Sequence, residues 1–478
     1  MKSLAKNSIL NMGYQLLNLI FPLIASMYVA RVLQATGVGK VAYAQNIASY
    51  FIVFASLGIP THGLRMISAS RNDKVEKNRI YSELLIINAM TTTLSLLLYG
   101  ILVFFTPQFR NDIPLYFCSG LIIVFNYINI DWLYQGNEDY AYIVFRNIGV
   151  KIISLCALLV FVHSQDDYLR YALIVSLASC GNYLLNIINS RNKVRFTLQN
   201  LQIRRHDKPI IVFAIAYFFG TLYSRIDTTM IGMLCDQEAV GYYSYAHKIL
   251  AVVLGICTAM SSAFLPRLSY YFQHDRVEFK RLINKGIQVI SFIAFPSVVG
   301  LYILSPMVIE IMYGRSFLSA ATTLRKLAPL IVILSFGNLL CYQTLVASGK
   351  EKLLIPACGI AAMINIGLNA LLIPRFSQDG AAVASVITEL FICGVELLYV
   401  LKNIQIKLNV QQIVMTCFCS LVMGLCVIIV IGFVDSLWGK VILGMLTGLI
   451  TYLGVCLLTK NQMLIYLKGK VLHFIEKK

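Results

Sequence analysis

Charged side chains are scarce in this chain of 478 residues: they make up 13% of it, whereas hydrophobic residues make up 58%. Soluble proteins carry roughly 25% charged residues. So few charges cannot cover the surface of a water-soluble globule, and the mean hydropathy of +0.74 agrees with this exclusion. We therefore expect an all-α polytopic membrane protein, since a spanning helix needs about 20 apolar residues.

Cysteine pairs spaced for zinc or redox chemistry are also missing. The twelve cysteines lie mostly inside apolar runs, and none of them forms a CxxC pair. A disulfide framework and a zinc site are both weak interpretations of this pattern. We interpret the cysteines as small apolar residues, and we expect no metal and no cofactor.

Acidic residues are few, at 22 against 40 basic ones, which leaves a net charge of +18. A basic excess can indicate a nucleic-acid partner, but here the basic residues occupy short segments between apolar runs, as topology signals do. We therefore expect no nucleic-acid partner.

The apolar runs predict about fourteen transmembrane helices. Their approximate bounds are 9–30, 41–61, 81–105, 114–134, 141–163, 169–189, 210–234, 242–265, 286–305, 327–347, 353–374, 381–401, 410–434 and 437–458. The first run exceeds the apolar region of a signal peptide and should stay in the mature protein. No connection exceeds roughly 20 residues, so the chain offers no soluble domain for ordinary enzyme chemistry.

The distribution of lysine and arginine predicts that both termini lie in the cytoplasm. With the N-terminus inside, inner segments hold 27 of the 40 basic residues and outer loops hold nine. Cytoplasmic loops retain Lys and Arg during insertion, so the bias favours this orientation.

An internal repeat divides the chain. Val38-Gly39, Tyr43-Ala44 and Ile47 recur 202 positions later, and Gly136, Glu138, Gln165 and Asp166 recur 213 positions later. The repeat predicts two homologous six-helix lobes, and parallel repeats of this kind are typical of transporters. The predicted divisions are an N-terminal lobe at 1–190, a basic cytoplasmic linker at 191–209, a C-terminal lobe at 210–401, and two further helices with a basic tail at 402–478.

Two predicted helices carry a polar face. Asn11, Gln15 and Asn18 lie on one face of the first helix, and Tyr217 and Thr221 lie on the equivalent face of the seventh. Polar stripes avoid lipid, so these residues are candidates to line a common cavity. Polar contacts between packed helices are the alternative interpretation.

Four basic residues lie within predicted helices, where a central charge costs roughly 2.5–3.5 kcal/mol and needs a partner, water or substrate. These are Arg146, Lys151, Arg225 and Lys248. Together they predict a cationic cavity for an anion such as a phosphate. For Lys151 and Arg225, structural ion pairs with Asp227, Glu389 or Glu396 are the alternative.

Other ionisable residues lie near predicted helix ends. We expect Arg31, Arg65 and Glu83 to reach towards the membrane interface. The single histidines His62, His163 and His247 are expected to be packing or interface residues.

Several segments resemble a known family. They are AKNSILNMGYQLLNLIFPLIASMYVARVL at 5–33, GVGKVAYAQNI at 37–47, LGIPTHGLR at 57–65, DWLYQGNEDY at 131–140, RIDTTMIGML at 225–234, VGYYSYAHKI at 240–249 and INIGLNALLIPRFSQDGAAVAS at 364–385. With the fourteen helices, they resemble the Wzx-type O-antigen flippases, the polysaccharide branch of the multidrug/oligosaccharidyl-lipid/polysaccharide (MOP) superfamily.

The resemblance implies a V-shaped bundle of the bacterial inner membrane. It would pass an undecaprenyl-pyrophosphate-linked O-antigen or capsular repeat unit from the cytoplasmic to the periplasmic leaflet, driven by a proton or sodium gradient. It places Arg31, Arg65, Lys151 and Asp227 where such flippases commonly carry charges. Membrane lipids are expected partners, as are other polysaccharide assembly proteins.

The predicted sites follow. Arg31, Arg65, Arg146, Lys151, Arg225 and Lys248 would bind substrate, and Asp227, Glu389 or Glu396 would couple the ion. A lipid II flippase or a multidrug exporter of the same superfamily stays open as an alternative. A polysaccharide polymerase or ligase is disfavoured, because such an enzyme should carry a long catalytic periplasmic loop.

Overall fold

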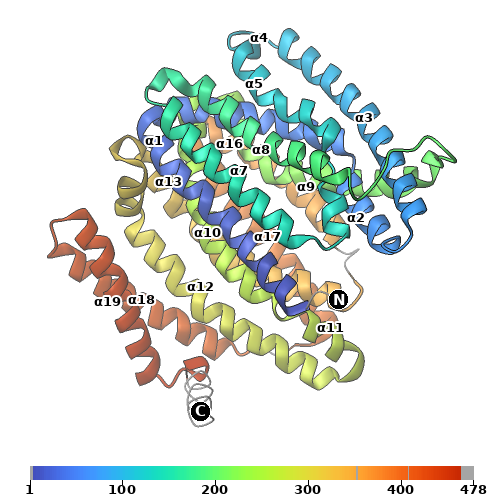
Figure 1. The fold of residues 1–478 in the computed structure, drawn as a ribbon. Helices are drawn as coiled ribbons and strands as arrows, with labels where there is room; N and C mark the ends of the chain where they lie inside the picture. Colours follow the sequence, from blue (N-terminus) through green and yellow to red (C-terminus); the bar gives the residue numbers. More distant parts are fainter. Residues whose placement is uncertain (1–3, 351–353, 407, 465–478) are drawn as a thin grey trace. The chain divides into compact units, whose positions relative to one another are not determined.

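The computed structural model describes residues 4–350, 354–406 and 408–464, with side chains from Phe21 onward except at 341, 354 and 355. This part of the chain is helical and contains no strand (Figure 1). The helices are α1 Leu4–Ser56, α2 Ile59–Ala69, α3 Lys74–Phe105, α4 Pro107–Arg110, α5 Ile113–Val124, α6 Asp131–Gly136, α7 Tyr140–Phe161, α8 Tyr168–Ser190, α9 Asp207–Leu234, α10 Gln237–Ser262, α11 Leu265–His274, α12 Arg276–Tyr313, α13 Ser319–Leu327, α14 Leu330–Phe336, α15 Thr344–Ala347, α16 Leu354–Phe376, α17 Gln378–Ile404, α18 Val410–Gly432 and α19 Leu437–Leu458.

Shorter turns connect some of these helices. The 3-10 turns are η1 Phe125–Ile128, η2 Gln165–Asp167, η3 Ile203–His206 and η4 Arg315–Phe317, and Gly337–Gln343 forms a π-helix, η5, between α14 and α15.

Twelve helices of the described residues are long and apolar enough to cross a membrane. Two further predicted spans account for the difference from fourteen. The run at 114–134 becomes the shorter apolar helix Ile113–Ile128, and the first two runs belong to the single element α1. The polytopic, all-α architecture is confirmed.

Helix α1 is broken at one residue. Gln34 has a φ of 57° and a ψ of −177°, so the 53-residue element consists of two helices joined at this point. At 1.5 Å per residue an unbroken helix would extend about 80 Å, far beyond a bilayer core of about 30 Å. The Gln34 side-chain amide donates to the carbonyl oxygen of Arg31 at 2.9 Å, which satisfies an acceptor freed by the break.

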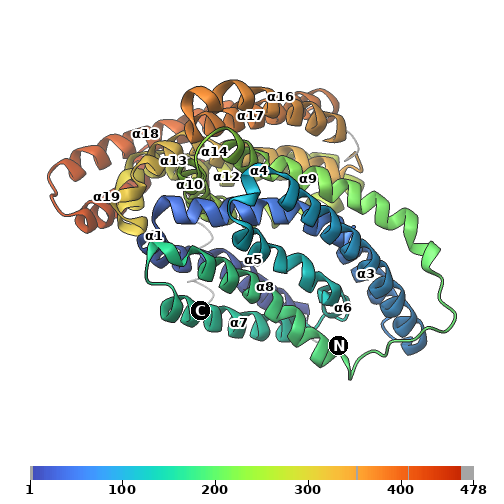
Figure 2. The same ribbon diagram turned by 90° about the horizontal axis from the view of Figure 1, so that it is seen from above.

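The chain forms two compact units, residues 1–241 and 242–478. Helix α9 therefore packs within the first unit, although the sequence assigns it to the C-terminal lobe at 210–401. In the first unit α1 contacts α3, α5, α7 and α9, and α7 lies beside α8 (Figures 1 and 2). The predicted lobe boundaries describe the sequence repeat and stay a prediction.

The core of the first unit lies where α2, α3 and α6 meet. Trp132 and Tyr134 are fully buried there against Ile59, Ile67 and Leu84. Gly63 of α2 faces the Trp132 ring so closely that an added Cβ would come within 2.8 Å of it. This packing fixes α2 against α6 and, through Leu84, against α3, which matters for the site described below.

The second unit has an apolar core of its own between α12, α18 and α19. Met423, Val427 and Tyr452 are buried there with Leu304 and Cys456. The Tyr452 hydroxyl donates to the carbonyl oxygen of Phe292 at 2.8 Å, so the one polar group of this set is satisfied.

Equivalent residues of the repeat meet in the first unit. A Cβ on Gly39 would lie 1.6 Å from the carbonyl oxygen of Gln237, and a Cβ on Gly241 would lie 2.3 Å from that of Ala35. Only glycine fits at either position, because no larger residue tolerates such backbone contact. The two glycines stand 202 positions apart, the offset of the repeat.

Candidate functional site

One side of α9 carries aromatic, hydroxyl and basic groups four residues apart: Phe213, Tyr217, Thr221 and Arg225. The C-terminal end of helix α1 and the adjoining helix α2 contact this side. The Arg65 guanidinium lies 4.9 Å from the Phe213 ring centroid, and the hydroxyls of Thr61 and Tyr217 are 2.8 Å apart. We call the contact of α9 with the second half of α1 and with α2 the α9 seam.

The seam continues along α1 as a buried polar network. The Asn46 amide donates to Thr229 Oγ1 at 2.7 Å and to the carbonyl oxygen of Arg225 at 3.4 Å. The Tyr50 hydroxyl lies 2.8 Å from the same Thr229 oxygen. Hydrogen bonds satisfy these polar groups, so α1 and α9 can meet through a polar contact inside a membrane helix bundle.

The two helices approach closely because α9 has a glycine at the contact. An added Cβ on Gly232 would come within 2.2 Å of the Tyr43 ring. Small residues permit such close approach in membrane bundles. Gln108 also donates to the Gly232 carbonyl oxygen at 2.9 Å.

Basic and hydroxyl groups of the seam are open on one side. Arg65 and Arg225 are exposed, and Tyr217 is 47% exposed. Arg225 follows Phe213 by twelve positions, roughly 18 Å at the helical rise. The seam thus presents two separated cations with hydroxyls between them, which suits an extended polar anion.

Arg146 belongs to a different cluster. Its guanidinium contacts the Asp131 carboxylate at 2.9 Å and donates to the Asn186 side-chain oxygen, and the Asn186 amide donates to Asp131 at 2.5 Å. The Arg146 side chain is 3% exposed. This arrangement is an ion pair between a buried Arg146 and a partly exposed Asp131, and it joins α6, α7 and α8.

The other predicted residues are distributed over both units. Lys151 of α7 is half-buried with its ammonium 5.4 Å from the Phe21 ring, and Arg31 is exposed near the break in α1. In the second unit the Lys248 ammonium lies 4.0 Å from the Tyr245 ring, while Glu389 and Glu396 are half-buried on α17. Asp227 is half-buried on α9.

Asn11, Gln15 and Asn18 lie on α1, but their side chains are outside the described residues. The predicted cavity-lining face of the first helix stays a prediction. The structure does describe the second predicted polar face, which contains Tyr217 and Thr221 on α9.

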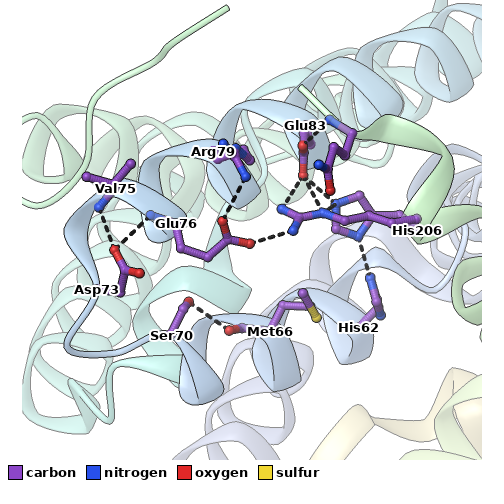
Figure 3. Close-up of polar contacts among 11 residues, drawn as sticks. His62, Met66, Ser70, Asp73, Val75, Glu76, Arg79, Glu83 and His206 are labelled. Atoms are coloured by element: carbon purple, nitrogen blue, oxygen red, sulfur yellow. Dashed lines mark hydrogen bonds and ion pairs between the residues drawn. The ribbon is translucent and has the colours of Figure 1, made fainter. Parts of the chain in front are cut away.

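The sequence alone did not identify a cluster of three candidate functional residues. Glu83, His206 and His62 form a hydrogen-bonded chain near the start of α9 (Figure 3). The expectation that Glu83 reaches the interface is wrong, because its side chain is 0% exposed and paired with Arg205. The sequence showed that Glu83 is a charged residue near the end of a predicted helix. Its partners, Arg205 and His206, are more than 100 residues further along the chain.

Within the described residues, no three His, Cys, Asp or Glu side chains are grouped to hold a metal ion. The polar groups brought together are hydroxyls, amides and guanidiniums. They can bind an anion or sugar hydroxyls through hydrogen bonds.

Comparison with family models gives two matches of more than half the chain. The model described as "Polysaccharide biosynthesis protein" matches residues 4–272, and the model described as "Lipid II flippase MurJ" matches residues 141–448.

Two curated relatives are distant in sequence but match over more than nine tenths of their own length. The chain is 22% identical over 406 residues to a protein of Escherichia coli (strain K12) described as "Putative O-antigen transporter", covering 84% of this chain and 97% of the relative. It is 24% identical over 387 residues to the capsular polysaccharide biosynthesis protein CapF of Staphylococcus aureus, covering 77% of this chain and 91% of CapF.

Solved structures establish the fold. The lipid II flippase MurJ in an inward closed conformation matches with a TM-score of 0.74 at 17% identity, over 96% of this chain and all of MurJ. An inward-facing multidrug resistance transporter of the MATE family and MOP superfamily matches with a TM-score of 0.65 at 13% identity, over 83% of this chain and 98% of that one. The expected MOP-type fold is confirmed.

Proposed function

The chain belongs to the polysaccharide biosynthesis protein family, and from this premise we propose that it is a flippase for a lipid-linked oligosaccharide. The substrate is an undecaprenyl-pyrophosphate-linked O-antigen or capsular repeat unit, moved from the cytoplasmic to the periplasmic leaflet of the bacterial inner membrane. Likeness to an O-antigen transporter and to a capsular polysaccharide biosynthesis protein supports this substrate class.

The α9 seam is the observation that carries the proposal. It places the exposed guanidiniums of Arg65 and Arg225 on either side of Tyr217 and Thr221. Guanidiniums bind phosphate oxygens strongly, and hydroxyls and aromatic rings suit a sugar. We assign the pyrophosphate or acidic sugars to these cations together with Arg31 and Lys151 of the same unit, while the prenyl tail stays in lipid.

Alternating access moves the substrate, and an ion gradient drives it in this proposal. Asp227, Glu389 or Glu396 is the acid that binds a proton or sodium ion in this proposal. Flipping by the triple variant Asp227→Asn, Glu389→Gln, Glu396→Gln should lose its dependence on the ion gradient. Unchanged flipping with unchanged ion dependence would remove this assignment.

The function is tested by deleting the gene in cells without redundant flippases. An undecaprenyl-linked oligosaccharide should accumulate on the cytoplasmic leaflet, and surface glycan should disappear. Mass spectrometry of the accumulated lipid identifies the sugar. Normal surface glycan with no accumulated intermediate contradicts the proposal.

A lipid II flippase is the second candidate, favoured by the match of the MurJ family model to residues 141–448 and by the MurJ fold. Cells depleted of their own lipid II flippase separate the two. Rescue of growth by this chain supports the second candidate, whereas rescue of O-antigen or capsule alone supports the first.

Both termini lie in the cytoplasm in this proposal, since the basic residues favour that orientation. A fluorescent protein that matures only in the cytoplasm, fused to the C-terminus, should be bright. An alkaline phosphatase fusion that is active at the same place would contradict the orientation.

A further inference from the structure

Glu83, His206 and His62 form a continuous hydrogen-bonded chain that joins α3, η3 and α2 (Figure 3). His206 Nε2 lies 2.7 Å from Glu83 Oε2, and His206 Nδ1 lies 2.7 Å from His62 Nε2. The side chains of Glu83 and His206 are both 0% exposed. Two imidazoles in series on a buried carboxylate are more than helix packing requires.

The ionised carboxylate fixes the direction of these hydrogen bonds. An ionised Glu83 only accepts, so His206 carries its proton on Nε2 and donates to it. Nδ1 of His206 is then an acceptor, and His62 donates to it from Nε2. Both imidazoles are therefore neutral in this arrangement, with Nδ1 of His62 at the outer end of the chain.

The same carboxylate holds the segment that precedes α9. Glu83 Oε1 accepts from the backbone N–H of Gln202 at 2.5 Å, and Oε2 accepts from the Arg205 guanidinium at 2.6 Å. Glu76 also binds Arg205, at 2.5 Å. Residues 202–206 are thus attached to α3 by charge-assisted hydrogen bonds.

Two further α3 side chains extend this attachment. Ser82 Oγ accepts from the backbone N–H of Thr197, and Asn78 Oδ1 accepts from that of Arg195, each at 2.8 Å. We call residues 195–206 with these contacts the linker latch. The latch ends at His206, and α9 with its seam begins at the next residue.

The charges around the chain balance only while both histidines are neutral. The facing groups are Arg65 of α2, Glu76, Arg79 and Glu83 of α3, Arg205 of η3, and Asp207 of α9. A proton added to His62 brings a cation into a buried place beside His206, Arg205 and Arg65. Burial, with these neighbours, lowers the pKa of His62 from 6.5 to about 4.

We propose that Glu83, His206 and His62 form a proton-binding site that keeps the linker latch closed when empty and opens it when a proton enters. The proton binds Nδ1 of His62 and forms one new N–H bond, while His62 keeps its Nε2–H bond to Nδ1 of His206. His62 then carries a positive charge in a buried place beside His206, Arg205 and Arg65. Repulsion between this cation and Arg205 weakens the attachment of residues 202–206 to Glu83.

The sign of the pH dependence follows from linkage. His62 has a lower pKa in the closed latch than the ordinary value near 6.5 that applies when the latch is open. The contribution of His62 to the free energy of latch closing is therefore complete above pH 6.5 and is lost progressively as the pH falls towards 4. The site makes the start of α9 sensitive to acidification on the side of the membrane where the linker latch lies, independently of which substrate the chain moves.

Hydrogen–deuterium exchange of the full chain in lipid nanodiscs tests the site. After correction for the intrinsic pH dependence of exchange, the protection of residues 195–206 should fall about 30-fold from pH 7.5 to pH 5, the change that the two His62 pKa values give. Glu83→Gln should expose the same residues at pH 7.5. Unchanged wild-type protection down to pH 5 would overturn the proposal without any variant.

Matched histidine variants separate this site from other titrating groups. His62→Gln should reduce the response to less than about 3-fold, because the group whose linkage sets it can no longer bind a proton. His163→Gln, at an exposed histidine outside the latch, should keep the wild-type response. A full response in His62→Gln would contradict the assignment.

Discussion

Arg146 and Arg225 lie in spanning helices of the same unit, yet they occupy opposite environments. The Arg146 side chain is 3% exposed and bound by Asp131 and Asn186, whereas Arg225 is exposed on the polar side of α9. The sequence gives both the same appearance, a basic residue in an apolar run. The comparison teaches that a charge matched by the fold serves stability, and that a charge left open on a polar face is available to a ligand.

The difference arises from which helices surround each arginine. Arg146 faces α6 and α8, which supply Asp131 and Asn186. Arg225 belongs to a seam where α1 supplies Asn46 and Tyr50, amide and hydroxyl groups that bond the backbone and Thr229. Because Asn46 and Tyr50 are neutral, the hydrogen bonds of the seam do not neutralise the charge of Arg225.

The largest effect on the free energy of unfolding is expected from Arg146→Ala. Removing one partner of a buried pair costs 3–5 kcal/mol, and partial solvent access to Asp131, at 36%, reduces this to about 2–3 kcal/mol. Thermal unfolding in detergent measures the loss. Arg146→Ala with Asp131→Asn should recover at least half of it, and wild-type stability of the single variant would contradict the pairing.

Arg225→Ala should act on transport and not on stability. We expect flipping to fall at least about tenfold, equivalent to about 1.4 kcal/mol, because our proposal assigns this cation to the substrate. The free energy of unfolding should change by less than about 0.5 kcal/mol, as for other open positions.

Lys151→Ala should behave like Arg225→Ala, and Arg170→Ala is the matched control. Arg170 is exposed and pairs with Asp167 three residues away, outside the seam. Transport of a lipid-linked oligosaccharide in inverted vesicles measures all three. Wild-type transport in both Arg225→Ala and Lys151→Ala would remove the cationic site.

The smallest effect is expected from Tyr217→Phe, which removes the hydroxyl next to Thr61 and keeps the ring. An exposed hydrogen bond of this kind contributes about 0.5 kcal/mol to stability. A double-mutant cycle with Thr61→Val should give a coupling energy of that size in thermal unfolding. A coupling energy of zero would show that the two hydroxyls do not stabilise the seam.

Hydropathy predicted the spans well because each apolar run must hide its backbone in a helix. The runs at 410–434 and 437–458 correspond to α18 and α19 within three residues. The break at Gln34 differs. Residues 31–40 were expected to form an outer loop, but they are helical apart from Gln34, which is neither glycine nor proline and gives no signal in the sequence.

The site was partly visible because helical spacing is local. The spacing placed Tyr217 and Thr221 on one side of the seventh predicted helix, and the structure adds Arg225 four residues further along α9. Asn46 and Thr229, which complete the seam, are 183 residues apart, and His206 and Glu83 are 123 apart. Such pairs depend on how helices pack, which periodicity within one helix does not report.

The contacts of Gly39 and Gly241 form a reciprocal pair. The same residue from each copy of the repeat presses against the backbone of the other copy, at Gln237 and at Ala35. A surface that meets its own duplicate in this way is self-complementary, as in an isologous dimer. A side chain introduced at either glycine would therefore clash with the backbone of the other segment, at Gln237 for Gly39 and at Ala35 for Gly241.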